Sequence, residues 1–286
     1  MYVSREFRIV DHDAGGLIYP QEPVEVEWLR IEEEAGEGLP AIPTQTELFR
    51  PENVLPVAIT EMYKRTSENQ ELTVVSAACS VGAEADTVIA THNKNHRRAG
   101  KLAVLGYDIN PIAVERAKTA TYAAIREGDP KKDSRLQARL KDFGFKTGSR
   151  LPLKGRYGVE SDAVREGHDV SFEKFDLTDS APFDGKADLV LANNVLYHLS
   201  PEQADRFLYN AAVMLQESGV ISLGNSSWAY DRRMQSIRSE NDKGYWLWLR
   251  EAEKMLKKTF GLKPIVRGHR NIAMMFSRDT SVTSTN

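Results

Sequence analysis

Apolar and polar positions change in a regular rhythm along most of the chain, and this rhythm predicts strands that alternate with helices. The run 72–78 is largely apolar, which is typical of a strand buried on both faces. Helical spacing follows over 83–95. A second apolar run over 102–107 ends at Asp108, and Asn110-Pro111 then predicts the cap and first residue of another helix, through Ala120.

The same alternation returns in the second half of the chain. Further strands are predicted over 170–175, 187–192, 220–223, 263–267 and 272–277, and further helices over 53–64, 201–215 and 246–260. Strands and helices in this order predict an α/β fold, in which a doubly wound, Rossmann-like and mostly parallel seven-stranded sheet forms the core.

Two stretches interrupt the rhythm and predict the domain organisation. Residues 1–43 end in a run rich in glutamate and proline, so we expect an N-terminal extension there and one domain over 44–286. Within that domain, charged residues and scattered glycines crowd 124–168. This segment predicts a small inserted subdomain that stands apart from the main sheet.

Composition narrows the function classes. The net charge of −3 and the pI of about 6.1 argue against nucleic acid or an anionic membrane as a partner. A single cysteine, Cys79, excludes an internal disulfide framework and a multi-cysteine zinc site. His92 and His96 share a helix face without a carboxylate, which favours a solvated surface over a metal site. Because no apolar run is long enough to span a bilayer, we expect a soluble, cytoplasmic protein.

Polar residues follow the predicted strands where a doubly wound sheet binds its ligands. Asp108 is suited to accept hydrogen bonds from the two hydroxyls of a ribose, although it would also serve as the cap of the following turn. Asp176 and Asn193-Asn194 follow two other strands, and a turn of small residues over 79–83 follows the first. This turn lacks the G-x-G-x-x-G spacing of dinucleotide binders, which argues against a nicotinamide-dependent dehydrogenase.

Several short blocks match one known family in register. They are Thr46-Glu47-Leu48-Phe49-Arg50 (T-x-F-F-R), the run 76–84 (A-A-C-S-x-G-x-E), Tyr107-Asp108-Ile109-Asn110 with Tyr122 beyond it, Phe175-Asp176-Leu177, Asn193-Asn194-Val195 (R-N-V, with asparagine in place of arginine) and the run 223–226 (G-x-S). On these blocks the chain resembles, over roughly 44–228, the chemotaxis-receptor methyltransferases of the CheR type, which use S-adenosylmethionine.

The resemblance implies a cofactor site and a catalytic site. Arg50, Asn194 and His198 are the expected catalytic residues. The resemblance places Arg50 near the carboxylate of the cofactor or near the acceptor, and Asn194 near the transferred methyl group. His198 departs from the family's pattern; its imidazole is the candidate base for an acceptor that needs deprotonation, although His198 would also suit simple packing in the cleft wall. The expected contacts to S-adenosylmethionine come from Thr46, Arg50, Ala78, Cys79, Ser80, Gly82, Glu84, Asp108, Ile109, Asp176, Leu177, Asn193 and Asn194. Cys79 is expected as a small loop residue and not as a nucleophile.

Two departures from the family's pattern direct the functional prediction. The segment before Thr46 is too short and too rich in glutamate and proline for the long helical domain that the family carries, and His198 stands where the family has a tyrosine. We therefore predict methyl transfer to a small-molecule or carboxylate acceptor. The alternatives are a protein-glutamate methyltransferase that docks a protein partner, and a binding module for S-adenosylmethionine without catalysis.

Overall fold

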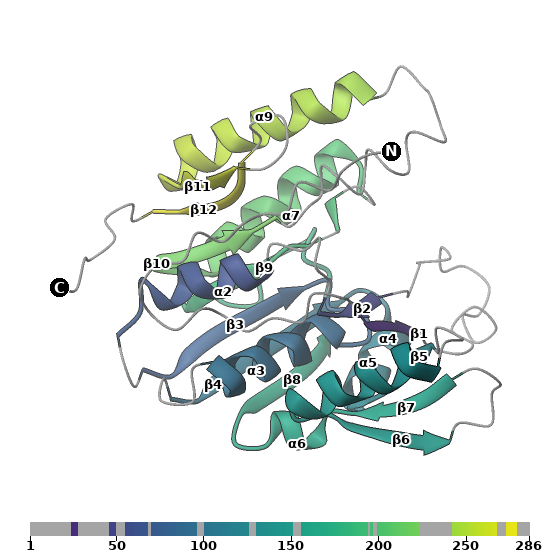
Figure 1. The fold of residues 1–286 in the computed structure, drawn as a ribbon. Coiled ribbons are helices and arrows are strands. Elements are labelled where there is room, and N and C mark those ends of the chain that lie inside the picture. The colour runs from purple at the N-terminus through teal and green to yellow at the C-terminus, as the bar shows by residue number, and fades with distance from the viewer. Residues whose placement is uncertain are drawn as a thin grey trace.

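A seven-stranded sheet forms the centre of the computed structural model, which describes residues 24–27, 46–49, 55–67, 70–95, 100–125, 130–150, 156–193, 195–196, 199–223, 242–267 and 273–278. The strand order is β11-β12-β10-β9-β3-β4-β8 (Figure 1). The strands are β3 (Leu72–Ala77), β4 (Leu102–Asp108), β8 (Asp169–Lys174), β9 (Ala187–Leu191), β10 (Leu215–Ser222), β11 (Lys263–Arg267) and β12 (Ala273–Ser277). β12 runs in the opposite direction to the other six strands of this sheet, and the pairings among β10, β9, β3, β4 and β8 are all parallel, so the predicted mostly parallel sheet is confirmed.

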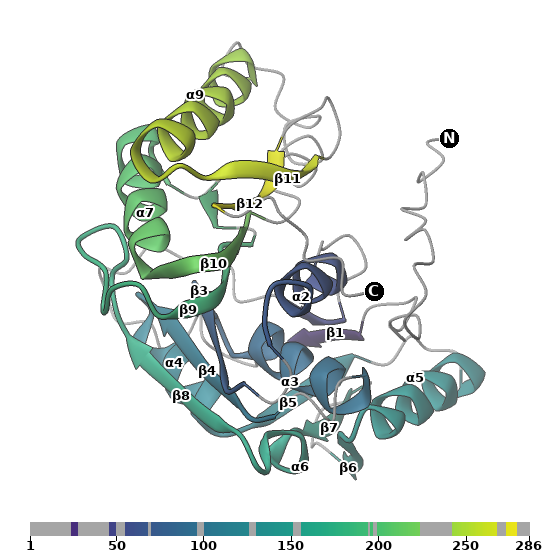
Figure 2. The same cartoon turned by 90° about the vertical axis from the view of Figure 1, so that its left-hand side faces the viewer.

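Helices cover both faces of this sheet, as Figure 2 shows for α7 and α9 on one side and α2 and α3 on the other. Alternate residues of β3 face the two cores: Val74 packs with α2 and α3, whereas Val75 packs with α7 and α9. The main-sheet helices are α2 (Leu55–Tyr63), α3 (Ala83–Asn95), α4 (Pro111–Lys118), α7 (Pro201–Met214) and α9 (Asp242–Phe260). The sheet is therefore doubly wound.

Local sequence explains where the helices begin and end. The Asn110 side chain accepts hydrogen bonds from the first turn of α4, and Pro111 is its first residue, as the sequence predicts. Ser200 and Gln203 form a capping box at the start of α7. The predicted end of α7 is wrong by one residue, because Leu215 already belongs to the parallel strand β10, where it pairs with Ala187.

A second, smaller sheet has the order β2-β1-β5-β7-β6, and all its pairings are antiparallel. Helix α5 packs on this sheet through buried Leu136 and Leu140. The elements are β1 (Val24–Glu27), β2 (Thr46–Leu48), β5 (Thr121–Ile125), β6 (Lys146–Arg150), β7 (Arg156–Glu160), α5 (Pro130–Asp142) and the short α6 (Asp162–Arg165) that follows β7.

The small sheet joins two segments that the sequence analysis treats separately. Strand β1 lies within the predicted extension 1–43, yet it pairs on one side with β2 and on the other with β5, at the border of the predicted insertion. The elements β2 and α6 both pack against α3 of the main domain. The boundaries at 43 and at 124–168 stay predictions, but the two segments share one sheet.

None of the helices in the described ranges is long and apolar enough to cross a membrane.

Candidate functional site

The strand order reverses direction at β3, and at such a switch point a doubly wound sheet characteristically leaves a crevice at its carboxyl edge. From β3 the chain adds β4 and then β8 on one side, whereas β9 and β10 lie on the other. Ligands of doubly wound sheets bind outside the carboxyl ends of the strands at such a switch point. Asp108 ends β4, and Ala78, Phe175 and Ala192 follow β3, β8 and β9, so these strand ends meet at one edge of the sheet.

The loop that follows β3 has a strained backbone. Ala78, Ser80 and Gly82 have φ values of 67°, 49° and 86°, and the first two are not glycines. Each non-glycine residue in this region costs about 1–3 kcal/mol and persists only where its surroundings hold it. The Cys79 N–H donates to the Tyr107 carbonyl at 2.9 Å, which fixes the loop to the end of β4. Such strain gathers at ligand sites, and it is the first structural pointer to a function here.

Asp108, which ends β4, fastens the loop from the other side. The side chain is 9% exposed, and its carboxylate accepts the Ser80 N–H at 2.8 Å and the Asn110 N–H at 2.9 Å. Burial raises the pKa of Asp108, against the opposing effect of the backbone N–H groups of Asn110, Ser80 and Ile109. Asp108 thus caps its turn, as the alternative interpretation holds, and it also reaches the loop of β3. A carboxylate has about four acceptor positions, so capacity remains for a hydroxyl donor such as a ribose.

Glu84 lies in the first turn of α3 and links three neighbouring strands. Its carboxylate accepts the Ser76 hydroxyl at 2.9 Å and the Asn193 amide at 2.6 Å. The Asn193 oxygen in turn accepts the Ser222 hydroxyl at 3.0 Å. Sequence reasoning identifies Glu84 and Asn193 but misses Ser222 as their partner, because an isolated serine in a buried strand carries no local signal.

The residues after β8 complete the opposite side of the crevice. Asp176 accepts the backbone N–H and the hydroxyl of Thr178 at 2.8 and 2.7 Å, which holds its turn. Leu177 is buried, and its carbonyl accepts the Asn210 amide at 2.8 Å. Ile109 is 47% exposed, and in the described part of the chain it is one of two large hydrophobic side chains that are exposed. An exposed isoleucine beside Asp108 would suit the apolar face of a nucleoside.

Two observations support a ligand with both polar and apolar parts at this edge. The Ser80 hydroxyl oxygen is buried and has no hydrogen-bond partner within the described residues, a state that costs free energy unless a ligand supplies the partner. The exposed Ile109 side chain supplies an apolar surface beside the Asp108 carboxylate. The residues present therefore fit a ribonucleoside cofactor.

Several predicted site residues are not placed by these contacts. Arg50, Asn194 and His198, the three predicted catalytic residues, lie outside the described residues. Thr46 is described only through its backbone in β2. Cys79 is 3% exposed, and burial raises the pKa of its thiol, which keeps it protonated and makes it a poor nucleophile.

The expectation of a solvated histidine face on α3 is wrong for His92. This side chain is 2% exposed, accepts a hydrogen bond from the Tyr63 hydroxyl and donates to the Gly100 carbonyl at 3.0 Å. The described residues contain no group of three or more His, Cys, Asp or Glu side chains that could hold a metal ion.

A doubly wound sheet with a buried acid and a strained loop of small residues at its switch point defines a nucleoside-cofactor-binding α/β protein. The comparison with protein families then gives the particular family: residues 44–241 match the model described as CheR methyltransferase, SAM binding domain. The chain belongs to this family, and S-adenosylmethionine is its cofactor.

Curated relatives agree with the family. The chain is 26% identical over 164 residues to a chemotaxis protein methyltransferase of Vibrio parahaemolyticus, a match that covers 56% of this chain and 55% of the relative. It is 27% identical over 181 residues to a chemotaxis protein methyltransferase of Pseudomonas putida, with 62% of each chain covered. The matches therefore span between about half and two thirds of these relatives.

Solved structures show only a distant likeness. Magnesium protoporphyrin IX methyltransferase from Synechocystis is 16% identical, with a TM-score of 0.40, and the match covers 78% of this chain and 76% of that one.

Proposed function

We propose that the protein transfers the methyl group of S-adenosylmethionine to a carboxylate oxygen of a protein. The observation that carries the proposal is the family match over 44–241, which includes the strand ends described above. The curated relatives are chemotaxis protein methyltransferases, which favours a protein acceptor over the small-molecule acceptor that the sequence analysis ranks first.

A carboxylate acceptor makes modest demands on the protein. Bound S-adenosylmethionine supplies an electrophilic methyl group, whose carbon–sulfur bond breaks as the new carbon–oxygen bond forms. A glutamate side chain with an ordinary pKa near 4.3 is already ionised at neutral pH and needs no general base. The contribution of the protein is then alignment of the two reactants, which is worth up to about 7–11 kcal/mol in favourable cases.

The resemblance implies a role for each of several residues, and the positions of the described ones at the carboxyl edge of the sheet support these roles. Asp108 would hold the ribose hydroxyls, the loop 78–82 would lie against the methionine end, and Leu177 would lie against the adenine. Glu84 and Asn193 would keep the ends of β3 and β9 at a fixed separation through the hydrogen bonds at 2.9 and 2.6 Å. Arg50, which the resemblance places near the carboxylate of the cofactor or near the acceptor, would orient the acceptor carboxylate by a charge-assisted pair.

The charge distribution supports an acidic acceptor. Residues 126–156, which include α5 and β6, contain ten Lys or Arg and four Asp or Glu, in a chain whose net charge is −3. Arg135, Lys141 and Lys146 in this segment are exposed. A basic subdomain on an acidic protein attracts an acidic protein surface and speeds its association at low ionic strength.

Labelling a lysate with methyl-labelled S-adenosylmethionine tests the proposal. Label on protein bands that is released as methanol at alkaline pH, the behaviour of a methyl ester, is the expected result. Label confined to the small-molecule fraction would instead establish the small-molecule acceptor. Binding of S-adenosylhomocysteine without any transfer would establish a binding module, and a thermal shift with NAD in place of S-adenosylhomocysteine would overturn the cofactor.

A further inference from the structure

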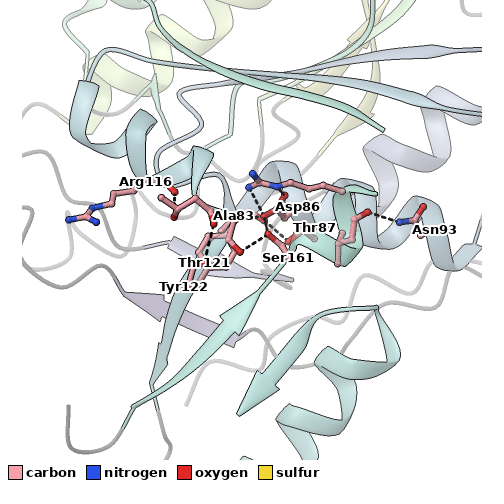
Figure 3. Close-up of polar contacts among 12 residues, drawn as sticks. Ala83, Asp86, Thr87, Asn93, Arg116, Thr121, Tyr122 and Ser161 are labelled. Atoms are coloured by element: carbon pink, nitrogen blue, oxygen red, sulfur yellow. Dashed lines mark hydrogen bonds and ion pairs between the residues drawn. The ribbon is translucent and has the colours of Figure 1, made fainter. Parts of the chain in front are cut away.

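A buried carboxylate near the loop 78–82 accepts hydrogen bonds from residues in and beside the small sheet. Asp86 lies in the first turn of α3, and its side chain is 0% exposed. It accepts Nε and Nη2 of Arg165 at 2.7 and 2.9 Å, the Ser161 hydroxyl at 2.5 Å and the Tyr122 hydroxyl. Figure 3 shows Tyr122 and Ser161 directed at Asp86. We call these four residues the Asp86 cluster.

The donors of the Asp86 cluster come from the small sheet and the segment that follows it. Tyr122 lies on β5, Ser161 follows β7, and Arg165 ends α6. Burial alone would lower the pKa of Arg165, but the hydrogen bonds and charge of Asp86 raise it, so the guanidinium keeps its charge. Burial raises the pKa of Tyr122, with the Asp86 charge acting in the same direction, so its hydroxyl stays a donor. The cluster is thus a satisfied buried ion pair.

Two physical connections lead from the cluster to the loop 78–82. The Asp86 N–H donates to the Gly82 carbonyl at 3.0 Å. The Arg165 guanidinium lies over the Phe172 ring, 4.9 Å from its centroid. That ring packs so closely on the loop that a Cβ added to Gly82 would lie 3.1 Å from Phe172 Cζ. The loop is therefore held from two sides by groups that the cluster fixes.

We propose that the Asp86 cluster positions the loop 78–82 for S-adenosylmethionine, so that Tyr122, Ser161 and Arg165 of the small-sheet region set the affinity of the cofactor site. The inference rests on the proposed use of this loop by the cofactor. Backbone strain at Ala78 and Ser80 persists only while the surroundings determine it. Loosening the cluster lets the strained residues relax, and the relaxed loop binds the cofactor less tightly.

A matched pair of tyrosine variants separates positioning from general stability. Tyr122→Phe removes the hydroxyl that donates to Asp86, near the start of α3. Tyr63→Phe removes another mostly buried tyrosine hydroxyl, which donates to His92 near the other end of the same helix. Both variants lose one side-chain hydrogen bond and keep the aromatic ring, so the Tm of each variant, measured beside its Kd, shows how much of any change in binding follows from lost stability. Only Tyr122→Phe acts on the loop.

Calorimetric titration with S-adenosylhomocysteine gives the affinity of each variant. We expect Tyr122→Phe to raise Kd at least fivefold and Tyr63→Phe to change it less than twofold. Ser161→Ala, which removes a second hydroxyl donor to Asp86, should also raise Kd more than Tyr63→Phe does. In the ligand-free protein, hydrogen exchange of the amides of residues 79–86 should be faster in Tyr122→Phe than in Tyr63→Phe.

The outcomes distinguish this inference from the proposed function. If Tyr122→Phe and Ser161→Ala both stay folded and bind S-adenosylhomocysteine within twofold of the wild-type protein, the cluster is structural and the inference is wrong. An equal rise in Kd for Tyr122→Phe and Tyr63→Phe would also overturn it, because the effect would then follow stability alone. If the wild-type protein binds no S-adenosylhomocysteine, the proposed cofactor site itself fails.

Discussion

Replacing Asp108 by asparagine tests the cofactor site most directly. The substitution keeps the size of the side chain but replaces one carboxylate oxygen by an NH₂ group. The two oxygens accept backbone N–H groups from Ser80 and Asn110 at 2.8 and 2.9 Å, so the NH₂ group must face one of these donors. This mismatch should lower the free energy of unfolding by about 1–3 kcal/mol.

Asp108→Asn should also weaken ligand binding, because the ribose hydroxyls lose a charged hydrogen-bond acceptor. A hydrogen bond from a ribose hydroxyl to a charged acceptor is worth about 1.5–3 kcal/mol, and 1.4 kcal/mol is tenfold in affinity. We therefore expect Kd for S-adenosylhomocysteine, measured by calorimetric titration, to rise about 10- to 100-fold. The wild-type affinity should also fall as the pH is lowered through the raised pKa of Asp108, because the ribose prefers the charged form. The asparagine variant should lack this dependence.

Asp188 offers a matched control for this experiment. It is also buried, burial raises its pKa as well, and it accepts the backbone N–H of Thr73 at 2.7 Å. Asp188 lies at the amino end of β9, at the edge of the sheet opposite the crevice. Asp188→Asn should therefore destabilise the fold without weakening binding. A folded Asp108→Asn protein that binds as tightly as Asp188→Asn would refute the ribose assignment.

Three further predictions concern packing, pH and charge. Gly106→Ala would place a methyl group 2.3 Å from Phe172 Cδ1, so the free energy of unfolding in urea should fall by about 1–3 kcal/mol, and Phe172→Leu in the same chain should restore part of it. Burial lowers the pKa of His168 below that of a histidine in the unfolded chain, which is about 6.5. The unfolded chain therefore binds the proton first, and folding stability should decline as the pH falls below about 6.5. The denaturant midpoint of His168→Gln should decline less over the same pH range. Lys141→Glu combined with Lys146→Glu should reduce kcat/KM for an acidic protein acceptor severalfold at low salt and leave Kd for S-adenosylhomocysteine unchanged. Charge reversal of the two exposed lysines in the last turn of α9 should change neither kcat/KM nor Kd.

The main sheet could be predicted from the sequence because its strands are short apolar runs that alternate with amphipathic helices. Each run that pairs in the parallel sheet is visible without knowledge of its partner. The small sheet is different. Strand β1 has four residues, and its partner β5 lies about a hundred residues further along the chain. Local patterning therefore gives no information about the pairing that places the N-terminal segment in the small sheet.

Some residues at and near the site can be predicted from the sequence, and others cannot. Asp108 and Asn193 are predictable since the carboxyl ends of parallel strands meet at one edge whatever the loops contain. The Asp86 cluster is not predictable, because a charged residue in a helix indicates a solvated face unless its distant partner is known. Arg165 is that partner, 79 positions further along the chain. The buried state of His92 has a similar cause, because neighbouring segments cover α3 where the sequence pattern leaves a polar face.

Asn193 shows how a departure from the family's motif can be compensated within the fold. The resembling family has arginine here, and arginine donates hydrogen bonds but accepts none. Asparagine does both: its amide donates to Glu84 at 2.6 Å, and its oxygen accepts the Ser222 hydroxyl at 3.0 Å. With Ser76 on the other oxygen of Glu84, one hydrogen-bonded chain crosses the ends of β3, β9 and β10. The asparagine therefore links the carboxyl ends of these three neighbouring strands through side-chain hydrogen bonds.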